Sequence, residues 1–334
     1  MTHRQNQRNA MLARFTLLVT TLQIAGAYGS EPIVKQWQAH DEYVYSIAFS
    51  ADGQRVVTAG GDNRAVIWSW PECERLYELP HDAAVYAAVI SPDGERIATG
   101  SGDGKVALWD LHDGQKLREQ QFHADAVYSL AYAPDGRSLA SIGGHGKRGD
   151  TTLRIWNSES LELRHERTEH TRPAYGVSFS PDGGKLVTTA GDRKVLLHRI
   201  GADAAIGEPT TLRPSHSSDV YRSAFSQNGQ WLATASQDKT VCVWNAATHQ
   251  RLHVLQDARQ ATYALHFSPD DNWLAVVGDE GRLRFYRTAG FAMEGDAKVS
   301  GEALYAVAWT PDCKCVASGG ASGVVVVRRI VPTP

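Results

Sequence analysis

The amino-acid sequence predicts an all-β fold in which seven similar units close into a ring. One tyrosine recurs at the same place in each unit, at intervals of 41, 42, 47, 46, 42 and 42 residues. Within a unit, short alternating apolar runs are separated by Gly, Asn and Asp turns, a pattern typical of antiparallel strands joined by hairpins. Repeats of this length with four strands each predict a seven-bladed β-propeller. The repeated tyrosines are Tyr45, Tyr86, Tyr128, Tyr175, Tyr221, Tyr263 and Tyr305.

The fifth unit shows the strands of one blade in order. Its first strand ends at Phe225, a turn follows at residues 226–229, and a second strand covers residues 231–234. A second hairpin turn at residues 237–239 leads to a third strand that ends at Asn245, and a fourth strand covers residues 251–255. The same order predicts units at residues 39–80, 81–122, 123–169, 170–215, 216–257, 258–299 and 300–331.

The two ends of the predicted ring complement each other. The chain ends with residues 324–330, the third strand of its blade, whereas residues 31–38 resemble a fourth strand. Pairing these two segments would close the ring and cover an otherwise exposed sheet edge. The sequence therefore predicts one propeller domain over residues 31–331, closed by its N-terminal strand.

The N-terminal segment differs from the rest of the chain. Residues 1–29 contain three arginines and no acid, then an apolar run at residues 15–24 and small residues at 25–27. This order is typical of a secretory signal peptide, and the run is shorter than the roughly 20 residues that a membrane-spanning helix needs. We expect export to the periplasm with cleavage near Ala27 or Gly29, and no membrane span afterwards. A cytosolic tail or an uncleaved anchor is the alternative.

The net charge and the absence of known site motifs disfavour several classes of function. Loss of residues 1–29 would leave 31 basic against 37 acidic residues, a formal charge of −6. An acidic chain without a basic run is a poor candidate for binding nucleic acid. The sequence has no phosphate-binding loop, haem-attachment motif or zinc-protease motif, so we expect neither a metal nor a cofactor. Its four cysteines leave a partial disulfide and free thiols both open.

Four units share a histidine before the first strand, an aspartate in the second hairpin and a tryptophan six residues after it. With these motifs, residues 32–330 resemble the WD-repeat β-propeller family. The resemblance implies that hydrogen bonds join the three side chains to a hydroxyl, that of Thr58, Thr99 or Thr234, inside the blade. One such set per blade favours a structural role over a Ser-His-Asp hydrolase triad. The sets are His40, Asp62 and Trp68; His81, Asp103 and Trp109; His123, Asp150 and Trp156; and His216, Asp238 and Trp244.

The other three units depart from this pattern. The fourth has His198 where tryptophan belongs. The sixth and seventh lack the histidine, the aspartate and the tryptophan, so the family's hydrogen bonds cannot form in full there. The residues at those positions are Ala258, Glu280 and Tyr286 in the sixth unit, and Ser300, Ser322 and Arg328 in the seventh.

The repeated tyrosines are the candidate functional site. In the family that the chain resembles, the first strand of each blade lines the central channel, so the seven side chains should encircle one mouth of it. Tyrosine combines a wide contact area with a hydroxyl and is enriched in recognition surfaces. The alternative is that each ring only fills space between blades.

Charged residues near the tyrosines suggest a partner class. Acidic residues precede several tyrosines and would form an acidic collar, which suits a basic partner through charge attraction and cation–π contact. Lysines and arginines in the second hairpin turns, among them Lys105 and Lys239, would offset much of this charge, so the net sign of the field at the mouth stays open. Two arginines oppose the acidic residues, and a glycine-rich insertion at residues 143–149 could clamp a partner. The candidate residues are Asp41, Asp82, Asp125 and Asp219, the arginines Arg172 and Arg259, and, in the insertion, His145, Lys147 and Arg148.

The sequence thus predicts an exported, non-catalytic scaffold that binds another protein or peptide on the tyrosine-ringed face. The alternative is a small-molecule or enzymatic site in the channel mouth, in which the tyrosines provide stacking, hydrogen bonds or acid and base groups.

Overall fold

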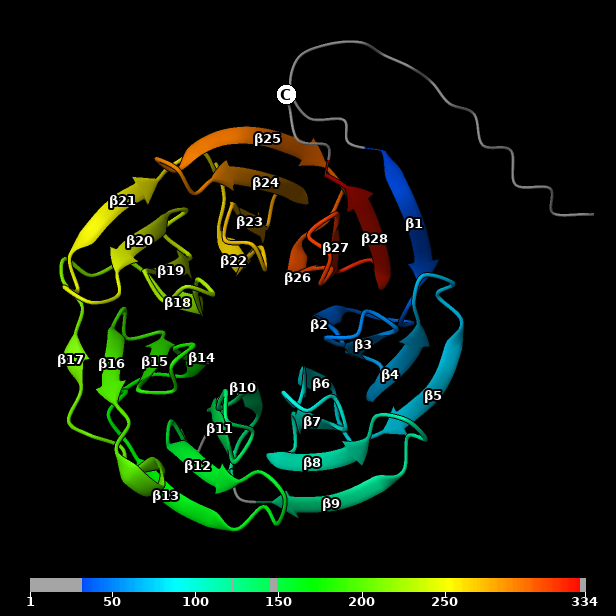
Figure 1. Cartoon of the computed structure of the whole chain (residues 1–334), viewed down its shortest axis with the longest axis horizontal. Coiled ribbons are helices and arrows are strands. Elements are labelled where there is room, and N and C mark those ends of the chain that lie inside the picture. The colour runs from blue at the N-terminus through cyan, green and yellow to red at the C-terminus, as the bar shows by residue number, and fades with distance from the viewer. Residues whose placement is uncertain (1–31, 122, 145–148, 331–334) are drawn as a thin grey trace, which may run out of the picture.

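A computed structural model describes residues 32–121, 123–144 and 149–330. It contains seven four-stranded antiparallel sheets arranged as blades around a central opening (Figure 1). The prediction of a seven-bladed β-propeller is therefore confirmed. In the described part of the chain no helix combines the length and the hydropathy that crossing a bilayer requires.

In blades one to six the strands run from the centre outwards in chain order, and in blade seven the N-terminal strand β1 takes the outermost place. Blade one comprises β2 (Val44–Phe49), β3 (Arg55–Gly60), β4 (Arg64–Ser69) and β5 (Arg75–Pro80); blade two β6 (Val85–Ile90), β7 (Arg96–Ser101), β8 (Lys105–Asp110) and β9 (Lys116–Gln121); blade three β10 (Val127–Tyr132), β11 (Ser138–Gly143), β12 (Leu153–Asn157) and β13 (Leu163–Arg167); and blade four β14 (Ala174–Phe179), β15 (Lys185–Ala190), β16 (Val195–Arg199) and β17 (Thr210–Thr211). Blade five comprises β18 (Val220–Phe225), β19 (Trp231–Ser236), β20 (Val241–Asn245) and β21 (Arg251–Leu255); blade six β22 (Thr262–Phe267), β23 (Trp273–Gly278), β24 (Arg282–Arg287) and β25 (Ala292–Lys298); and blade seven β26 (Leu304–Trp309), β27 (Cys315–Gly320), β28 (Val324–Arg329) and β1 (Ile33–Gln38).

The N-terminal strand closes the ring, as predicted. β1 pairs antiparallel with β28, with Trp37 opposite Val325, and the two strands lie side by side in Figure 1. Trp37 also packs edge-on against Trp68 of blade one, with ring centroids 5.9 Å apart. The closing strand therefore completes blade seven and contacts blade one.

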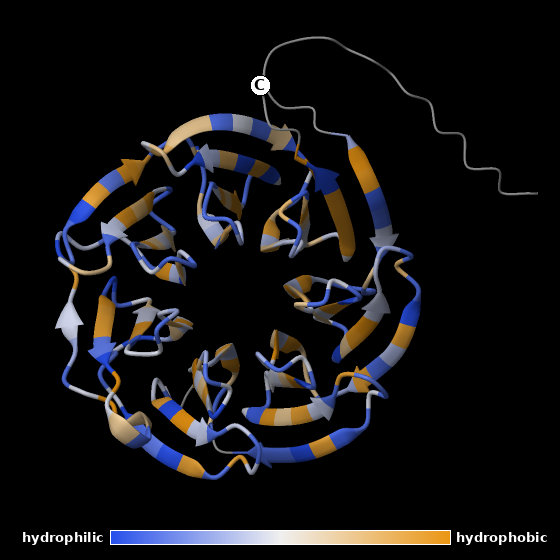
Figure 2. Ribbon diagram, viewed as in Figure 1, coloured by the Kyte–Doolittle hydropathy of each residue, from blue (hydrophilic) through white to orange (hydrophobic). Residues whose placement is uncertain are grey.

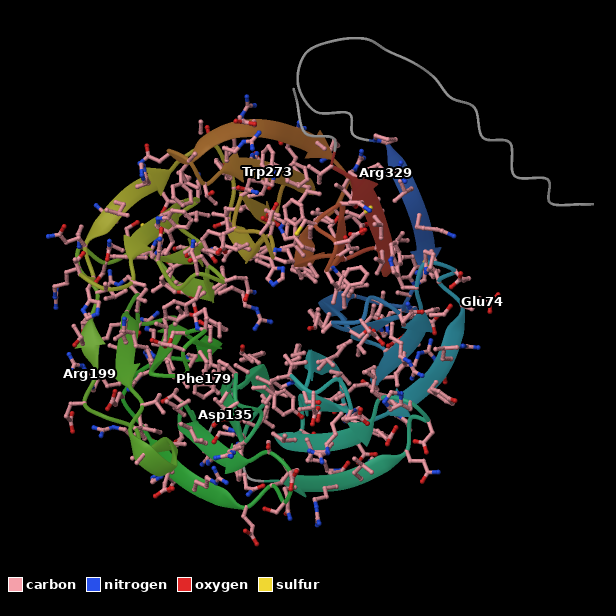
Figure 3. The ribbon with its side chains drawn as sticks, viewed as in Figure 1. Glu74, Asp135, Phe179, Arg199, Trp273 and Arg329 are labelled. Carbon is pink, nitrogen blue, oxygen red and sulfur yellow. The ribbon has the colours of Figure 1, made fainter. Side chains whose placement is uncertain are left out.

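The core lies between neighbouring blades. One apolar cluster joins Ile67 and Leu79 of blade one to Val85 and Trp109 of blade two. Figure 2 shows hydrophobic segments along the inner strands, whereas hydrophilic and hydrophobic segments alternate along the outermost strands. In Figure 3 side chains fill the space between the sheets, and Glu74 points outward at the circumference. Each blade therefore depends on its neighbours for its core.

The complete hydrogen-bond set of the family forms in blades one and five. In blade one, His40 Nδ1 lies 2.8 Å from Asp62 Oδ1 and His40 Nε2 lies 2.8 Å from Thr58 Oγ1. Trp68 Nε1 donates to the same Thr58 hydroxyl at 2.9 Å. Blade five repeats this arrangement at 2.9, 2.8 and 3.1 Å. These bonds tie the loop before the first strand to the second hairpin and so fix the start of the channel-lining strand.

Blade two differs from the expected set. His81 bonds Thr99 at 3.0 Å, and Trp109 donates to Thr99 at 2.8 Å. Asp103, however, accepts from Ser101 at 2.6 Å and leaves His81 Nδ1 without a hydrogen-bond partner.

Blades three and four modify the set in other ways. Arg154 Nη1 lies between His123 Nδ1 and Asp150 Oδ2, 2.9 Å from each, so Asp150 reaches the histidine through the guanidinium. The hydroxyl of this blade is that of Ser141. In blade four, His198 Nε2 lies 3.4 Å from the Thr188 hydroxyl, a longer contact than the tryptophans make.

The four cysteines are free thiols in this structure. Cys242 is 1% exposed within β20, and Cys315 is buried in β27. Cys73 and Cys313 are half-buried.

Candidate functional site

Each repeated tyrosine is the extra residue of a β-bulge. In blade one, Val44 pairs with Gly60 and Ser46 pairs with Ala59, so Tyr45 has no opposite residue. The same shift of register occurs at the corresponding tyrosine of all seven first strands. A bulge re-aims the side chain of its extra residue and increases the local twist. Seven bulges at one register therefore turn seven tyrosines toward the channel mouth.

The seven tyrosines form a closed ring of aromatic contacts, called the tyrosine ring below. Neighbouring ring centroids are between 4.9 Å apart, at Tyr45 and Tyr86, and 5.7 Å apart, at Tyr45 and Tyr305. Tilted and edge-on pairs at these separations are mutually attractive. All seven side chains are half-buried. Together with Arg222 they line a cavity of about 280 Å³ at the channel mouth.

An eighth tyrosine extends the ring outward. Tyr43 is 41% exposed, and its ring lies 5.5 Å from that of Tyr45 and 6.1 Å from that of Tyr305. Sequence reasoning missed Tyr43 because it has no counterpart in the other units. Its position two residues before Tyr45, directly before β2 begins, was the available signal.

The phenol groups of the tyrosine ring stay protonated at neutral pH. Burial raises the pKa of every one of them, and that of Tyr263 rises to about 12. Nearby carboxylates, including Asp219 and Asp279, raise the pKa of Tyr221 and Tyr263 further. The Tyr221 hydroxyl donates to Gln237 Oε1. The ring therefore presents hydrogen-bond donors on an aromatic wall rather than bases.

The predicted acidic collar is partly neutralised within the fold. Asp41 pairs with Arg64 at 2.8 Å, and Asp82 pairs with Lys105 at 2.6 Å. Asp125 accepts from the backbone of Asp150 at 3.1 Å.

Other carboxylates still act on the ring. In the described residues, Asp219 and Asp279 have no cationic side chain within ion-pair distance. Asp279 was missed by sequence reasoning, although it occupies the place of Gly61 and Gly102 in the first two blades. Glu42, Asp125 and Glu302 also raise tyrosine pKa values through their charge. The charge that the phenols experience is thus mainly negative.

The remaining predicted residues lie as follows. Arg172 lowers the pKa of Tyr175 by its charge, against the larger effect of burial. The Arg259 amide donates to Glu280 at 3.1 Å. His145, Lys147 and Arg148 lie outside the described residues.

Arg222 is a further functional candidate that sequence reasoning missed. It follows Tyr221 directly, at a position where the other six blades have small residues. Its Nη1 donates to Ser129 Oγ of blade three at 2.8 Å and to the Tyr175 carbonyl of blade four at 3.3 Å. The available signal was a long cation in a column of small residues: Ser46, Ala87, Ser129, Gly176, Ala264 and Ala306.

Gly176 makes room for this arrangement. A Cβ atom there would lie 2.9 Å from the Tyr221 carbonyl oxygen and 3.2 Å from Arg222 Cα. Because contacts that short require the neighbouring backbone to move, a side chain at this position would separate blades four and five.

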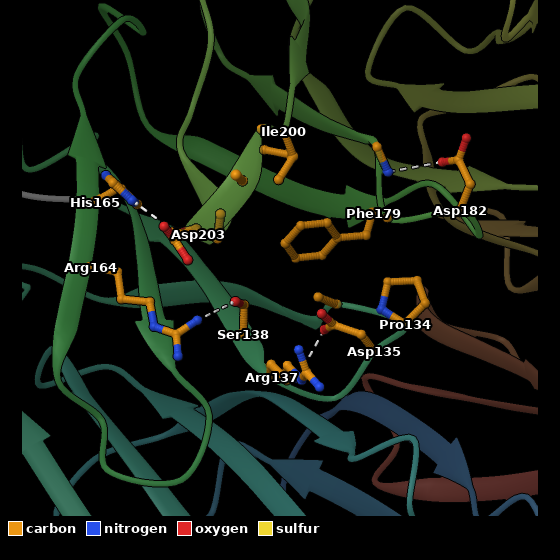
Figure 4. A pocket seen from close by; sticks show the side chains of 16 residues that line it. Pro134, Asp135, Arg137, Ser138, Arg164, His165, Phe179, Asp182, Ile200 and Asp203 are labelled. Atoms are coloured by element: carbon orange, nitrogen blue, oxygen red, sulfur yellow. Dashed lines mark hydrogen bonds between the residues drawn. The ribbon is translucent and has the colours of Figure 1, made fainter.

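A larger hollow of about 770 Å³ lies between blades three and four at the end of the propeller remote from the tyrosines (Figure 4). Its polar groups are engaged within the fold. Arg164 donates to Ser138 Oγ at 3.1 Å, His165 Nε2 lies 3.0 Å from the Asp203 carbonyl, and Asp182 accepts from a turn amide. Among the described residues no group of three metal-ligating side chains occurs. These polar groups are therefore used within the fold and do not point together at a shared ligand position in the hollow.

Comparison with known proteins agrees with this architecture. A family model described as WD domain, G-beta repeat matches residues 31–69, 73–110, 114–157, 161–199, 207–245 and 249–287. The chain is 26% identical over 137 residues to the WD repeat-containing protein WDS homolog of Arabidopsis thaliana, covering 39% of this chain and 26% of that protein. It is 31% identical over 131 residues to WD repeat-containing protein 90 of Homo sapiens, covering 37% and 8% respectively.

A third relative, Protein tipD of Dictyostelium discoideum, is 33% identical over 73 residues, covering 22% of this chain and 12% of that protein. The chain therefore matches only a minor part of each relative's length. Six matched repeats together with seven four-stranded blades lead to one conclusion: the chain belongs to the WD-repeat family of β-propellers.

Proposed function

We propose that this protein is a non-catalytic interaction scaffold that binds another protein or peptide across the tyrosine ring. Similarity to WD-repeat proteins supports a propeller scaffold for protein interaction in general. The observation that carries the finer proposal is the closed circle of seven half-buried tyrosines around a cavity of about 280 Å³. A rigid aromatic surface binds with little loss of side-chain entropy, which is why tyrosine is frequent in recognition surfaces.

The charge at the channel mouth favours a basic partner. Five carboxylates raise the pKa of ring tyrosines, and aromatic faces attract cations. The five are Glu42, Asp125, Asp219, Asp279 and Glu302. Association with a basic segment should therefore weaken as salt concentration rises.

We also propose that the protein acts outside the cytoplasm. The order of charge, apolar run and small residues at positions 1–29 supports export with cleavage near Ala27 or Gly29. N-terminal sequencing of the protein from a periplasmic extract should begin at about residue 28 or 30. An intact N-terminus in the cytosolic fraction would contradict this proposal.

The enzymatic alternative receives less support. A base must lose its proton near working pH, whereas the phenols are held protonated by burial. Tyrosines that bind through their faces and donate hydrogen bonds fit recognition better.

Substitution of neighbouring ring tyrosines tests the interaction proposal. Tyr86, Tyr128 and Tyr175 should be changed together to alanine and, separately, to phenylalanine. We expect the alanine variant to stay folded and to lose the proteins that co-purify with the wild type, because three neighbouring aromatic rings of the contact surface are removed. The phenylalanine variant should keep most of the binding. Circular dichroism and the melting temperature check folding, and affinity purification checks binding.

A matched control is Tyr77→Ala on the outer strand β5, where the side chain is 38% exposed. This variant should keep every partner. Unfolding of the alanine ring variant would instead support a space-filling role for the tyrosines. Retention of all partners by a folded alanine variant would contradict the proposal.

A further inference from the structure

Arg222 places a cation on the inner side of the tyrosine cavity. Its side chain leaves blade five, passes Gly176 of blade four and reaches Ser129 of blade three. Both printed hydrogen bonds come from one nitrogen, Nη1. The guanidinium has five N–H donors, so those of Nε and Nη2 have no acceptor in the described residues.

The environment of Arg222 differs from that of the other sheltered arginines. Arg154 pairs with Asp150 at 2.9 Å, and Arg284 pairs with Glu280. Arg222 has no carboxylate within ion-pair distance in the part of the chain that the structure describes. Arg222 is half-buried and lines the tyrosine cavity, so its remaining N–H groups are accessible to an acceptor that the surrounding fold does not itself provide.

The free donors of Arg222 define the class of ligand. Nε and Nη2 lie on one edge of the guanidinium plane and match the two oxygens of a carboxylate. Burial lowers the pKa of Arg222 to about 10, so the group remains a cation at neutral pH. A ligand that fills the aromatic cavity around Arg222 would displace water from it and so strengthen such a pair.

We propose that Arg222 binds the C-terminal carboxylate of a polypeptide whose last residue enters the tyrosine ring end-on. This inference rests on the proposed function and specifies the part of the partner that is bound. Because the ring is closed, with every neighbouring centroid pair within 5.7 Å, a chain end can enter along the axis whereas a continuous chain would have to double back.

The charge pattern selects the chain end over an acidic side chain. The carboxylates around the mouth, among them Asp219 and Asp279, repel an acidic segment and attract a basic one. A basic segment still carries one carboxylate, at its C-terminus. The carboxylates around the mouth would attract the basic side chains of such a tail, and Arg222 in the cavity would bind its terminal carboxylate.

Peptide binding tests this assignment. The probes are N-terminally fluorescein-labelled heptapeptides Gly-Lys-Ser-Gly-Lys-Ser-Xaa, with Xaa alanine, leucine or phenylalanine, made as free acids and as C-terminal amides. Fluorescence anisotropy with the folded wild-type protein should show binding of at least one free acid. The corresponding amide should bind at least about tenfold more weakly, since it loses a charge-assisted bidentate hydrogen bond.

Two variants connect the effect to Arg222. Arg222→Gln should reduce binding of the free acid to the level of the amide, and Arg222→Lys should give an intermediate affinity, because lysine keeps the charge but not the two-pronged geometry. Should Arg222→Gln fail to fold, the Nε–H resonance of Arg222 in the wild type provides an independent readout. It should shift with the free acid and not with the amide.

Several outcomes would overturn the assignment. These are equal binding of acid and amide, full binding by folded Arg222→Gln, no binding of any free acid at about 1 mM, and equally tight binding of an amidated peptide with an internal glutamate. Retention of co-purifying partners by Arg222→Gln, together with their loss from the tyrosine-to-alanine variant, would refute this inference alone. Retention by both variants would refute the proposed function.

Discussion

At the scale of single residues, one position on the second strand has opposite roles in different blades. Ser141 of blade three and Ser318 of blade seven occupy the same register, opposite Leu130 and Val307. Ser141 bonds His123 Nε2 at 2.7 Å and accepts from Trp156 Nε1 at 2.8 Å. Ser318 is fully buried, and its hydroxyl has no hydrogen-bond partner. The same chemical group therefore completes a network in one blade and is only buried in the other.

Alanine at these two positions should have unequal effects. Ser141→Ala leaves a buried imidazole and a buried indole without their shared partner, so we expect the free energy of unfolding to fall by about 2–3 kcal/mol. Ser318→Ala removes an unpaired buried hydroxyl and should change it by less than about 0.5 kcal/mol or increase it. Urea denaturation of both variants beside the wild type measures the difference. Equal losses would show that the hydrogen bonds of Ser141 add nothing.

At the scale of strands and hairpins, the sequence predicts the architecture better than the side-chain directions. Alternating apolar runs and turn residues locate the strands of the fifth unit within a few residues of β18 to β21, and the ends of the chain predict the closing strand β1. The bulge at each tyrosine is not visible in the sequence, because it is a mismatch between two strands and not a property of one. The spacing predicts that the tyrosines share one face, whereas the bulges explain how they can all contact one another.

The misses in the site also have physical reasons. Ser141 was overlooked because the insertion at residues 143–149 increases its distance in sequence from Asp150, so the usual offset points to the wrong residue. Arg222 and Asp279 belong to positions that are small in most blades, and the sequence shows them as exceptions only when the units are aligned on their tyrosines and compared position by position. Pairing of Asp41 and Asp82 with neighbouring cations depends on contacts between adjacent strands, which the order of residues does not contain.

At the scale of the whole molecule, seven similar blades carry unequal polar networks. Blades one and five have the full family set, and blade seven has neither the histidine nor the tryptophan. The six matches of the family model end at residue 287, before that last blade. Closure by β1 nevertheless joins blade seven to blade one through Trp37. Blade seven, which lacks the family's histidine and tryptophan, is therefore held in the ring by its strand pairing with β1 and by the contact of Trp37 with blade one.

The histidines of these networks should give the propeller a stability maximum near neutral pH. Burial lowers the pKa of His123 and of His198 to about 4. Between pH 7 and pH 5 these histidines become protonated in the unfolded chain but stay neutral in the folded chain. Acidification over this range should therefore lower the free energy of unfolding by about 2 kcal/mol for each such histidine. Burial alone would lower the pKa of His216, but the hydrogen bonds to Asp238 and Cys242 outweigh that effect and raise this pKa to about 9. Its stabilising contribution is complete below pH 6.5 and is lost as the pH rises through 9.

His198→Trp isolates one part of this profile. The substitution removes a buried titrating group that is 2% exposed and places an indole donor beside the Thr188 hydroxyl, as tryptophan lies beside threonine in blades one and five. Urea denaturation at pH 5 and pH 7 should show a loss of stability on acidification that is smaller than the wild-type loss by about 2 kcal/mol. A folded variant whose stability falls as steeply as that of the wild type would exclude His198 as a source of acid sensitivity and leave the other buried histidines and the aspartates to account for it.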